Sequence, residues 1–225
     1  HGQGVAKDYV KAREWWEKTA AQGNASAQYN LGVMYRDGQG VAQDSAKARE
    51  WLEKAAAQGD AKAQYNLGLM YYHGQGVAKD LFKAREWYEK AAEQDMVWAQ
   101  NNLGLMYRDG EGGVKDLAKA HKWFEKAAAQ NSAPAQYNLG VMYANAEGVS
   151  KDLAKARAWY EKAAVQGHAK AQNNLGVMYG LGQGVAKDLS KAREWFEKAA
   201  TQNKDAAAAE KARQALDIIS SEGRL

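Results

Sequence analysis

The chain repeats itself with a constant period of 36 residues. The motif Asn-Leu-Gly-(Val/Leu)-Met-Tyr begins at Asn30, Asn66, Asn102, Asn138 and Asn174. A tryptophan recurs with the same step at Trp15, Trp51, Trp87, Trp123, Trp159 and Trp195. A period of roughly 20 to 50 residues is typical of stacked structural units that contact only their neighbours. The sequence therefore predicts a repeat array without one central core, and it places function on a surface.

Each unit reads as two helices. In the unit 24–59, the apolar residues of the first half are spaced like one face of a helix, which predicts a helix over about 25–36. The two glycines of the segment 37–43 predict a reversal of the chain, and Asp44 then predicts the N-cap of a second helix. A hairpin of this size cannot bury its apolar faces alone, so we expect consecutive αα-hairpins to stack.

A glycine recurs inside the first helix of every unit. Gly32 is the first of them, and glycine inside a helix costs about 1 kcal/mol relative to alanine. The equivalent positions are Gly68, Gly104, Gly140 and Gly176. Because the same cost is repeated, we expect a neighbouring helix to cross at this point, too close to allow a Cβ atom.

Composition argues against several classes of protein. The chain has no cysteine, which excludes disulfides, thiolate zinc sites and cysteine nucleophiles, and leaves both the cytoplasm and the periplasm open. The formal charge of +4 comes from 31 basic and 27 acidic residues that are mixed along the chain. A nucleic-acid-binding protein needs a basic face, so we predict no nucleic-acid partner. No run approaches the ~20 apolar residues of a membrane span.

Enzymatic motifs are missing from the sequence. The histidines His1, His73, His121 and His168 occupy different repeat positions, so none forms a pair with metal-ligand spacing. The recurring Gly-x-Gly follows a helix and lacks the third glycine of a phosphate-binding loop, and there is no Gly-x-Ser-x-Gly elbow. Only Tyr72 beside His73 hints at a cluster of titratable groups. We predict a non-enzymatic protein without metal or cofactor.

The full repeat resembles that of the Sel-one-like repeat family, a branch of the tetratricopeptide-like α-solenoids. Its string is Ala-Gln-Tyr-Asn-Leu-Gly-Val-Met-Tyr, then Gly-Gln-Gly-Val-Ala-x-Asp, then Lys-Ala-Arg-Glu-Trp-x-Glu-Lys-Ala-Ala. The resemblance implies an all-α, right-handed α-solenoid of stacked αα-hairpins. It also implies a bacterial adaptor or scaffold that binds proteins, in the periplasm or secreted. Some relatives carry a disulfide in every repeat, and this cysteine-free chain departs from them.

The repeat pattern also predicts the organisation of the chain. We expect a half repeat over 1–23, five full repeats over 24–59, 60–95, 96–131, 132–167 and 168–203, and a C-terminal capping helix and tail over 204–225. Residues 1–5 correspond to residues 73–77, so the chain opens in the middle of a repeat. We therefore expect a longer native protein, with an open apolar face at this end that is available for self-association.

Positions that differ between the units are candidates for partner recognition. By the resemblance, the first helix of each unit lines the concave side of the array, and tyrosine and arginine are frequent anchors of protein interfaces. The predicted partner-binding residues on it are Tyr29, Arg36, Tyr65, Tyr72, His73, Asn101, Arg108, Tyr137 and Asn173. The alternative is that the tyrosines only cover neighbouring helices.

The third inter-repeat turn differs from the others. It reads Asp95-Met96-Val97-Trp98, where other units have small polar residues. Exposed apolar clusters are often functional, so Met96 and Trp98 join the predicted partner-binding residues. The alternative is that Trp98 fills a gap beside its own helix.

The constant asparagines, of which Asn30 is the first, allow two hypotheses. They hold the backbone of an extended peptide, as the corresponding asparagine does in peptide-binding tetratricopeptide domains, or each bonds a neighbouring helix or loop. We favour the structural role, because five identical side chains are most simply explained by five identical scaffolds.

Together these features predict an adaptor or scaffold that binds a protein or peptide through the concave face. Two alternatives stay open. One is a structural spacer or self-assembling element, and the other is an inhibitor or immunity protein that masks a partner enzyme.

Overall fold

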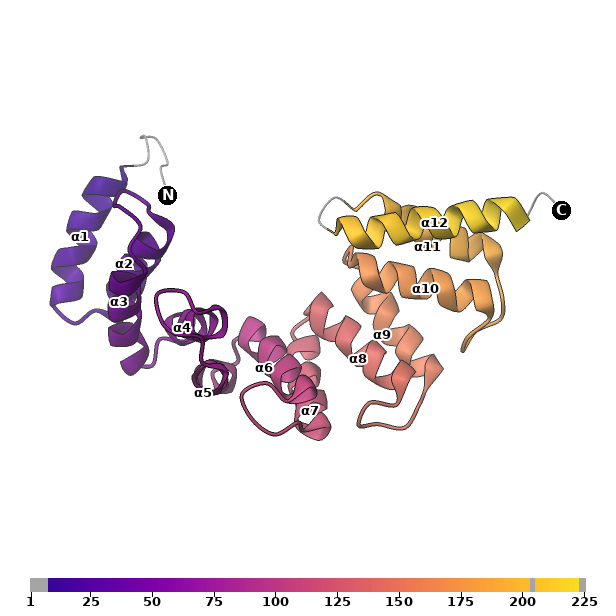
Figure 1. Ribbon diagram of the computed structural model, residues 1–225, viewed down its shortest axis with the longest axis horizontal. Helices are drawn as coiled ribbons and strands as arrows, with labels where there is room; N and C mark the ends of the chain where they lie inside the picture. The colour runs from indigo at the N-terminus through magenta and orange to yellow at the C-terminus, as the bar shows by residue number, and fades with distance from the viewer. Residues whose placement is uncertain (1–7, 203–204, 223–225) are drawn as a thin grey trace. The chain divides into compact units, whose positions relative to one another are not determined.

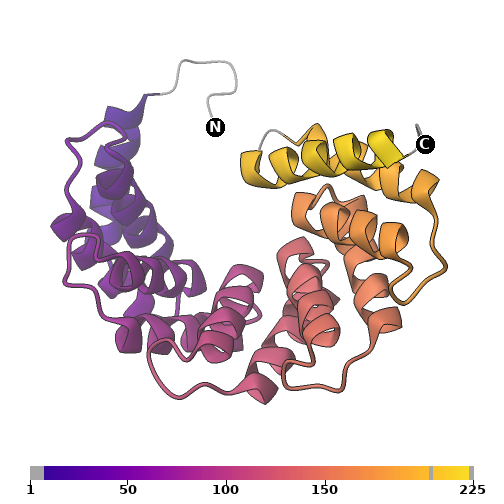
Figure 2. The same cartoon turned by 45° about the vertical axis from the view of Figure 1, so that its right-hand side comes forward.

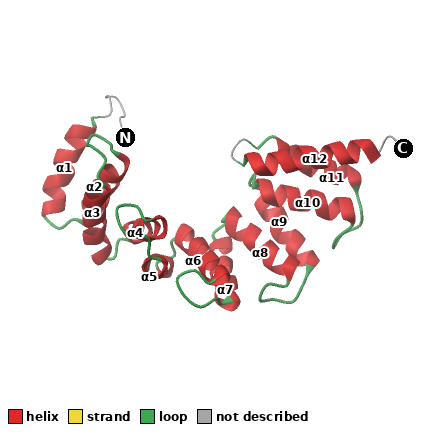
Figure 3. Ribbon diagram, viewed as in Figure 1, coloured by secondary structure: helices red, strands yellow, loops and turns green. Residues whose placement is uncertain are grey.

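The computed structural model describes residues 8–202 and 205–222, and all regular structure in them is helical (Figure 3). The chain divides into two compact units, one ending at Asp116 and one beginning at Leu117. Unit 1 contains α1 (Tyr9–Ala21), α2 (Ala25–Asp37), α3 (Ser45–Ala57), α4 (Ala61–His73), α5 (Leu81–Glu93) and α6 (Val97–Asp109). Unit 2 contains α7 (Leu117–Ala129), α8 (Ala133–Asn145), α9 (Leu153–Val165), α10 (Ala169–Leu181), α11 (Leu189–Ala200) and α12 (Ala206–Glu222).

Within each unit the helices pack in chain order (Figures 1 and 2). In unit 1, α2 pairs with α3 and α4 pairs with α5, and each hairpin contacts the next through α3 and α4 or through α5 and α6. In unit 2 the same pattern joins α8 with α9 and α10 with α11. The predicted all-α array of stacked αα-hairpins with a 36-residue step is confirmed.

Local capping explains where the helices begin and end. The Asp44 carboxylate accepts a hydrogen bond from the backbone N–H of Lys47 at 3.0 Å, which caps α3 as predicted. The aspartates that precede α5, α9 and α11 do the same. The last residue of α2 is Asp37, one residue beyond the predicted end. Gly38 follows as the C-cap, and its φ of 67° lies in the left-handed region.

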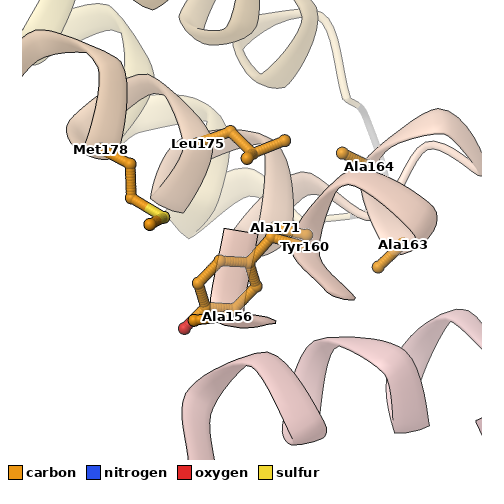
Figure 4. Packing of buried hydrophobic residues seen from close by; sticks show 7 residues of the cluster. All are labelled: Ala156, Tyr160, Ala163, Ala164, Ala171, Leu175 and Met178. Atoms are coloured by element: carbon orange, nitrogen blue, oxygen red, sulfur yellow. The ribbon is translucent and has the colours of Figure 1, made fainter. Parts of the chain in front are cut away.

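The core consists of small clusters that join neighbouring helices. In unit 2, Tyr160 of α9 packs against Leu175 and Met178 of α10, among four alanines of the same two helices (Figure 4). Alanines allow the helices to approach closely at high packing density. In unit 1, Trp51 of α3 packs against a cluster that joins Ala20 of α1 to Leu31 of α2. Trp51 therefore lies where its repeat meets the helix before it.

Four of the repeated helix glycines, Gly32, Gly68, Gly140 and Gly176, lie where the second helix of the same hairpin crosses. A Cβ atom on Gly68 would lie 2.5 Å from ring carbons of Tyr88, and one on Gly32 would lie 2.7 Å from Cγ of Leu52. The predicted close crossing is therefore present.

A buried glutamine in the first helix of each repeat was not singled out from the sequence. Gln64 donates to the backbone oxygen of Ala56 at the end of the preceding helix, at 3.3 Å, and accepts a hydrogen bond from Gln94 at 2.7 Å. Equivalent bonds to the preceding helix are made by Gln28, Gln100, Gln136 and Gln172. Because buried polar groups need partners, this ladder fixes how successive repeats stack.

The two ends of the described chain differ. At the C-terminal end, Leu216 and Ile219 of α12 pack against a cluster that includes Phe196 of α11. At the other end, Trp15 of α1 is 73% exposed. The predicted mid-repeat loop over residues 1–5 lies outside the described residues, and self-association stays a prediction. Among the described helices none has the length and apolarity to cross a bilayer.

Candidate partner-binding surface

Two neighbouring pockets lie on unit 1, and α2, α4 and α6, the first helices of their repeats, provide most of the lining residues. The smaller, here called the Tyr72 pocket, has a volume of about 220 Å³ and is lined by Leu69, Tyr72, His73, Tyr88, Asn102, Leu105, Met106 and Glu111. The larger, the Arg36 pocket, has a volume of about 500 Å³ and is lined by Arg36, Asp37, Gln43, Ser45, Asn66, Leu69, Met70, His73 and Gln75. Because both include Leu69 and His73 of α4, they form one continuous surface across α2, α4 and α6.

The Tyr72 pocket has an apolar floor and a polar rim. Its rim is built around the Tyr72 hydroxyl, which donates to Oε2 of Glu111 at 2.9 Å. This hydrogen bond, together with burial and the charges of Glu111 and Asp109, raises the pKa of Tyr72. The His73 ring stands edge-on to the Tyr72 ring, with 5.1 Å between centroids. The rim is therefore an ordered set of polar groups around apolar side chains.

The wall of the Tyr72 pocket is held by a buried tyrosine. Burial raises the pKa of the Tyr88 hydroxyl, which has the Asn102 side chain as a hydrogen-bond partner. Asn102 also hydrogen-bonds to Tyr65, whose ring centroid lies 5.8 Å from that of Tyr88. These contacts link the pocket-lining residues Tyr88 and Asn102 to Tyr65 of α4.

In the Arg36 pocket the arginine is already engaged. Arg36 donates from Nε to Oδ1 of Asp37 at 2.7 Å and from Nη2 to Oδ2 at 2.9 Å. The hydrogen bond to Asp37 raises the pKa of Arg36. Its Nη1 donates to Oδ1 of Asn66, and Nδ2 of Asn66 donates to the backbone oxygen of Lys62 at 2.8 Å. Arg36 is thus a fixed part of the wall.

A third pocket lies in unit 2, at the face of α12. It has a volume of about 150 Å³ and is lined by Tyr137, Lys170, Asn173, Asn174, Ala207, Ala208 and Lys211. Asn173 donates to the backbone oxygen of Ala208 at 2.7 Å. The amide predicted to bind a partner is therefore already used to hold α12.

Comparison with known proteins identifies the family. A model of the Sel1 repeat matches residues 1–24, 25–60, 61–96, 99–132, 133–168 and 169–204. The chain belongs to the Sel1 repeat family. Sel1 repeats usually mediate protein interactions, and the family and its structural neighbours are non-catalytic repeat proteins. A search among curated proteins gives no significant match.

Solved structures of other Sel1 repeat proteins are similar over almost the whole chain. A protective antigen of uropathogenic Escherichia coli strains is 37% identical over 99% of this chain, with a TM-score of 0.86. This chain covers 51% of that antigen, about half its length. A Sel1 repeat protein from Oxalobacter formigenes is 32% identical over 94% of this chain and 91% of its own, with a TM-score of 0.85. An immunity protein from Pseudomonas aeruginosa, 22% identical over 100% of this chain and 79% of its own with a TM-score of 0.51, shares the fold.

The Sel1 repeat asparagines are engaged by neighbouring side chains where the structure describes their partners. Asn66 accepts from Arg36, Asn102 is bonded to tyrosines as described above, and Asn174 hydrogen-bonds to Tyr160. These contacts support the structural hypothesis for the asparagine ladder, since each asparagine links its helix to the preceding repeat.

The remaining predicted residues are distributed unevenly. Tyr29 packs against the cluster that joins α3 to α4, which fits the alternative that tyrosines cover neighbouring helices. Asn101 is 8% exposed and offers a partner almost no surface, because it lies on the side of α6 that packs inward. Arg108 forms a two-pronged ion pair with Asp109, at 2.8 and 2.9 Å. Tyr137 lines the third pocket.

The apolar turn before α6 lies outside both pockets of unit 1. Trp98 is 60% exposed, and Met96 is half-buried at the N-cap of α6, where it makes no side-chain capping bond. The exposure of Trp98 disfavours the hypothesis that it fills a gap beside its own helix. Its contact with a partner stays a prediction.

Glu111 is the rim residue that sequence reasoning missed. The equivalent loop positions hold Gln39, Gln75, Glu147 and Gln183. A comparison of the repeats reveals the change of charge, but the hydrogen bond to Tyr72 depends on how α4 meets the following loop.

His168 caps α10 in place of the asparagine, aspartate or serine used by other repeats. Its Nδ1 accepts a hydrogen bond from the backbone N–H of Ala171 at 3.3 Å, and its ring stacks on Tyr137 with 4.7 Å between centroids. Burial, followed by the charge of Lys170, lowers the pKa of His168, although Asp205 opposes this shift. The neutral imidazole is therefore the form that the folded chain favours.

We expect the stability of unit 2 to fall as the pH is lowered. The pKa of His168 is lower in the folded than in the unfolded chain, so the unfolded chain takes up the proton first. The stabilisation is complete above the unfolded value of 6.5 and is lost as the pH falls below it. The loss should be on the order of 1 kcal/mol, the typical worth of an N-cap, because a protonated ring can no longer accept the hydrogen bond from Ala171.

Hydrogen exchange of α10 between pH 7.5 and 5 measures this effect after correction for intrinsic exchange rates. His168→Asn keeps a capping oxygen that does not titrate in this range and serves as the control. An equal pH response in the variant would show that other groups cause it.

Proposed function

We propose that this Sel1 repeat protein is a non-enzymatic binder of a protein segment, and that the segment lies on the surface of unit 1 formed by α2, α4 and α6. The observation that carries this proposal is the pair of adjoining pockets that share Leu69 and His73. Interface anchors typically fill such pockets, with an apolar centre and a polar rim. The general role of Sel1 repeats in protein interactions supports the same conclusion.

The chemistry of the pockets favours binding over catalysis. A general base or nucleophile needs a pKa near the working pH, whereas the pKa of Tyr72 is raised by its hydrogen bond to Glu111. Arg36 is held by Asp37 and Asn66. The groups on this surface are thus arranged to hold shape, and they leave apolar side chains such as Leu69 and Leu105 partly accessible.

The double variant Leu69→Glu and Leu105→Glu should weaken the binding of peptides selected on the full chain from a random display library. Two carboxylates on the pocket floor would have to be desolvated on binding, and the loss should be at least tenfold, since hot-spot changes cost about 2 kcal/mol or more. Isothermal titration of selected peptides measures the effect.

The matched control is Val141→Glu with Val177→Glu, which changes the equivalent repeat positions in unit 2. Circular dichroism checks that both double variants stay folded. A library without enriched peptides, or enriched peptides that bind both double variants equally well, would contradict the proposed surface.

A second candidate function is self-association through α1. Trp51 and Trp87 each pack against a cluster that joins their own repeat to the preceding one, whereas Trp15 is 73% exposed. Sedimentation over a range of concentrations distinguishes the two, because self-association predicts a concentration-dependent mass and the first proposal does not.

A further inference from the structure

The Tyr72 pocket presents a carboxylate above an apolar floor. We propose that it receives a single lysine or arginine side chain of the partner segment, with the cationic head at Glu111 and the methylene stem on Leu69, Leu105 and Met106. This inference rests on the proposed function, because it names the chemistry that the same surface recognises.

The charge at the rim is negative and only partly balanced. Asp109 is held in an ion pair by Arg108 at 2.8 Å. Glu111, in contrast, forms no ion pair within the described residues and accepts one hydrogen bond, from Tyr72. A carboxylate has about four lone-pair sites, so Glu111 keeps acceptor capacity for an ammonium or guanidinium group. Charge-assisted hydrogen bonds of this kind are roughly twice as strong as neutral ones.

The size and lining of the pocket suit one long side chain. Its volume of about 220 Å³ lies below the ~300 to 1,000 Å³ of small-molecule sites. Lysine and arginine bury their methylene stems along apolar surface while the charged head stays at the rim. Nζ of Lys79 lies 5.7 Å from the centroid of the Tyr72 ring, which is within the range of a cation–π contact. The cationic head of the guest is therefore assigned to Glu111 and not to this ring. Rim and floor thus match the two parts of a basic side chain.

The equivalent sites of other repeats lack this combination. In the Arg36 pocket the position of Tyr72 is held by Arg36 and that of Glu111 by Gln75, so a basic guest would meet a positive charge and no free carboxylate. In unit 2 the corresponding residues are Ala144 and Gln183, which offer neither a ring nor a charge. A carboxylate recurs at Glu147, but there the position of Tyr72 is held by Arg108. The pair of a tyrosine and a glutamate at these positions is therefore found only at Tyr72 and Glu111.

A set of short peptides tests the inference on the full chain. The peptides are acetyl-Gly-Ala-X-Ala-Gly-amide with lysine, arginine, norleucine or glutamate at X, and the readout is the NMR signals of the methyl groups of Leu69, Leu105 and Met106. We expect the lysine and arginine peptides to shift these signals saturably at millimolar concentration, about tenfold more tightly than norleucine. The glutamate peptide should cause no shift, and added salt should weaken the basic peptides.

The variant Glu111→Gln tests whether the preference for a basic side chain comes from the charge of Glu111 or from the shape of the pocket. Glutamine is isosteric and can still accept from the Tyr72 hydroxyl, so the pocket should stay intact while the preference for lysine over norleucine disappears. The matched control is Glu147→Gln, which changes the equivalent loop position in unit 2 and should leave the preference unaltered.

Three results would overturn the inference: norleucine binding as tightly as lysine, an unchanged preference in Glu111→Gln, or no saturable shift at millimolar peptide. The same experiments distinguish a failure of this inference from a failure of the proposed function. If library peptides without any basic residue bind through Leu69 and Leu105, the binding surface is supported and the basic specificity is wrong.

Discussion

Gly112→Ala should lower the free energy of unfolding of unit 1 by about 3 kcal/mol, whereas Gly59→Ala should lower it by about 1 to 2 kcal/mol. Both glycines have a left-handed backbone, with φ of 67° and 88°. A Cβ atom on Gly112 would lie 2.1 Å from the backbone oxygen of Leu81, while one on Gly59 would meet nothing within 4 Å. The conformational cost is common to both variants, and only Gly112 adds a clash with backbone atoms that are fixed at the start of α5.

Urea unfolding of the full chain, combined with hydrogen exchange of α5 and α6, measures this difference. Exchange gives a local value, which suits a repeat array whose stability is approximately a sum of repeat and interface terms. Equal losses in the two variants would mean that the loop after α6 moves away from α5 at little cost.

Gly176→Ala should destabilise unit 2 and Gly180→Ala should stabilise it, with a difference of about 2 to 3 kcal/mol between the variants. The two glycines lie one turn apart in α10. A Cβ atom on Gly176 would lie 2.6 Å from the buried ring of Phe196, whereas one on Gly180 would make an ordinary contact of 3.7 Å with Ala192. Alanine improves helix propensity by about 1 kcal/mol at both positions. At Gly176 the clash with the crossing helix α11 outweighs this gain, so the variant is expected to lose stability.

Thermal and urea unfolding of both variants shows directly whether each substitution raises or lowers the free energy of unfolding. If Gly176→Ala were also stabilising, the repeated helix glycine would have no packing role. A loss of stability in Gly180→Ala would show that α10 itself, and not the crossing, resists a side chain.

Local sequence patterns predicted well where the helices begin and end. The spacing of apolar residues placed α2 within one residue at its end, and Asp44 was recognised as the cap of α3. These features depend on residues within one or two turns of each other, so they can be read without knowing the fold. The repeated glycine was informative for a related reason, because an unfavourable residue that recurs at one position indicates a contact.

The candidate site was predicted less completely. The positions of Arg36 and Tyr72 on one surface followed from the repeat, and both line pockets. The burial of Asn101 and the engagement of Asn173 with Ala208 did not follow. Both depend on which side of the first helix meets the next repeat, and neighbouring positions on a helix can differ completely in exposure.

The repeat period, the helix caps and the turn glycines are properties of short segments, so they were sufficient to predict a stack of helical hairpins of the Sel1 repeat kind. Which variable residues form a site depends instead on how the hairpins pack together. The bond between Tyr72 and Glu111 joins residues 39 positions apart, and the bond between Gln58 and Gln28 joins residues 30 apart. Such pairs arise from the distance and rotation between successive hairpins, which packing of whole helices sets and no local pattern specifies.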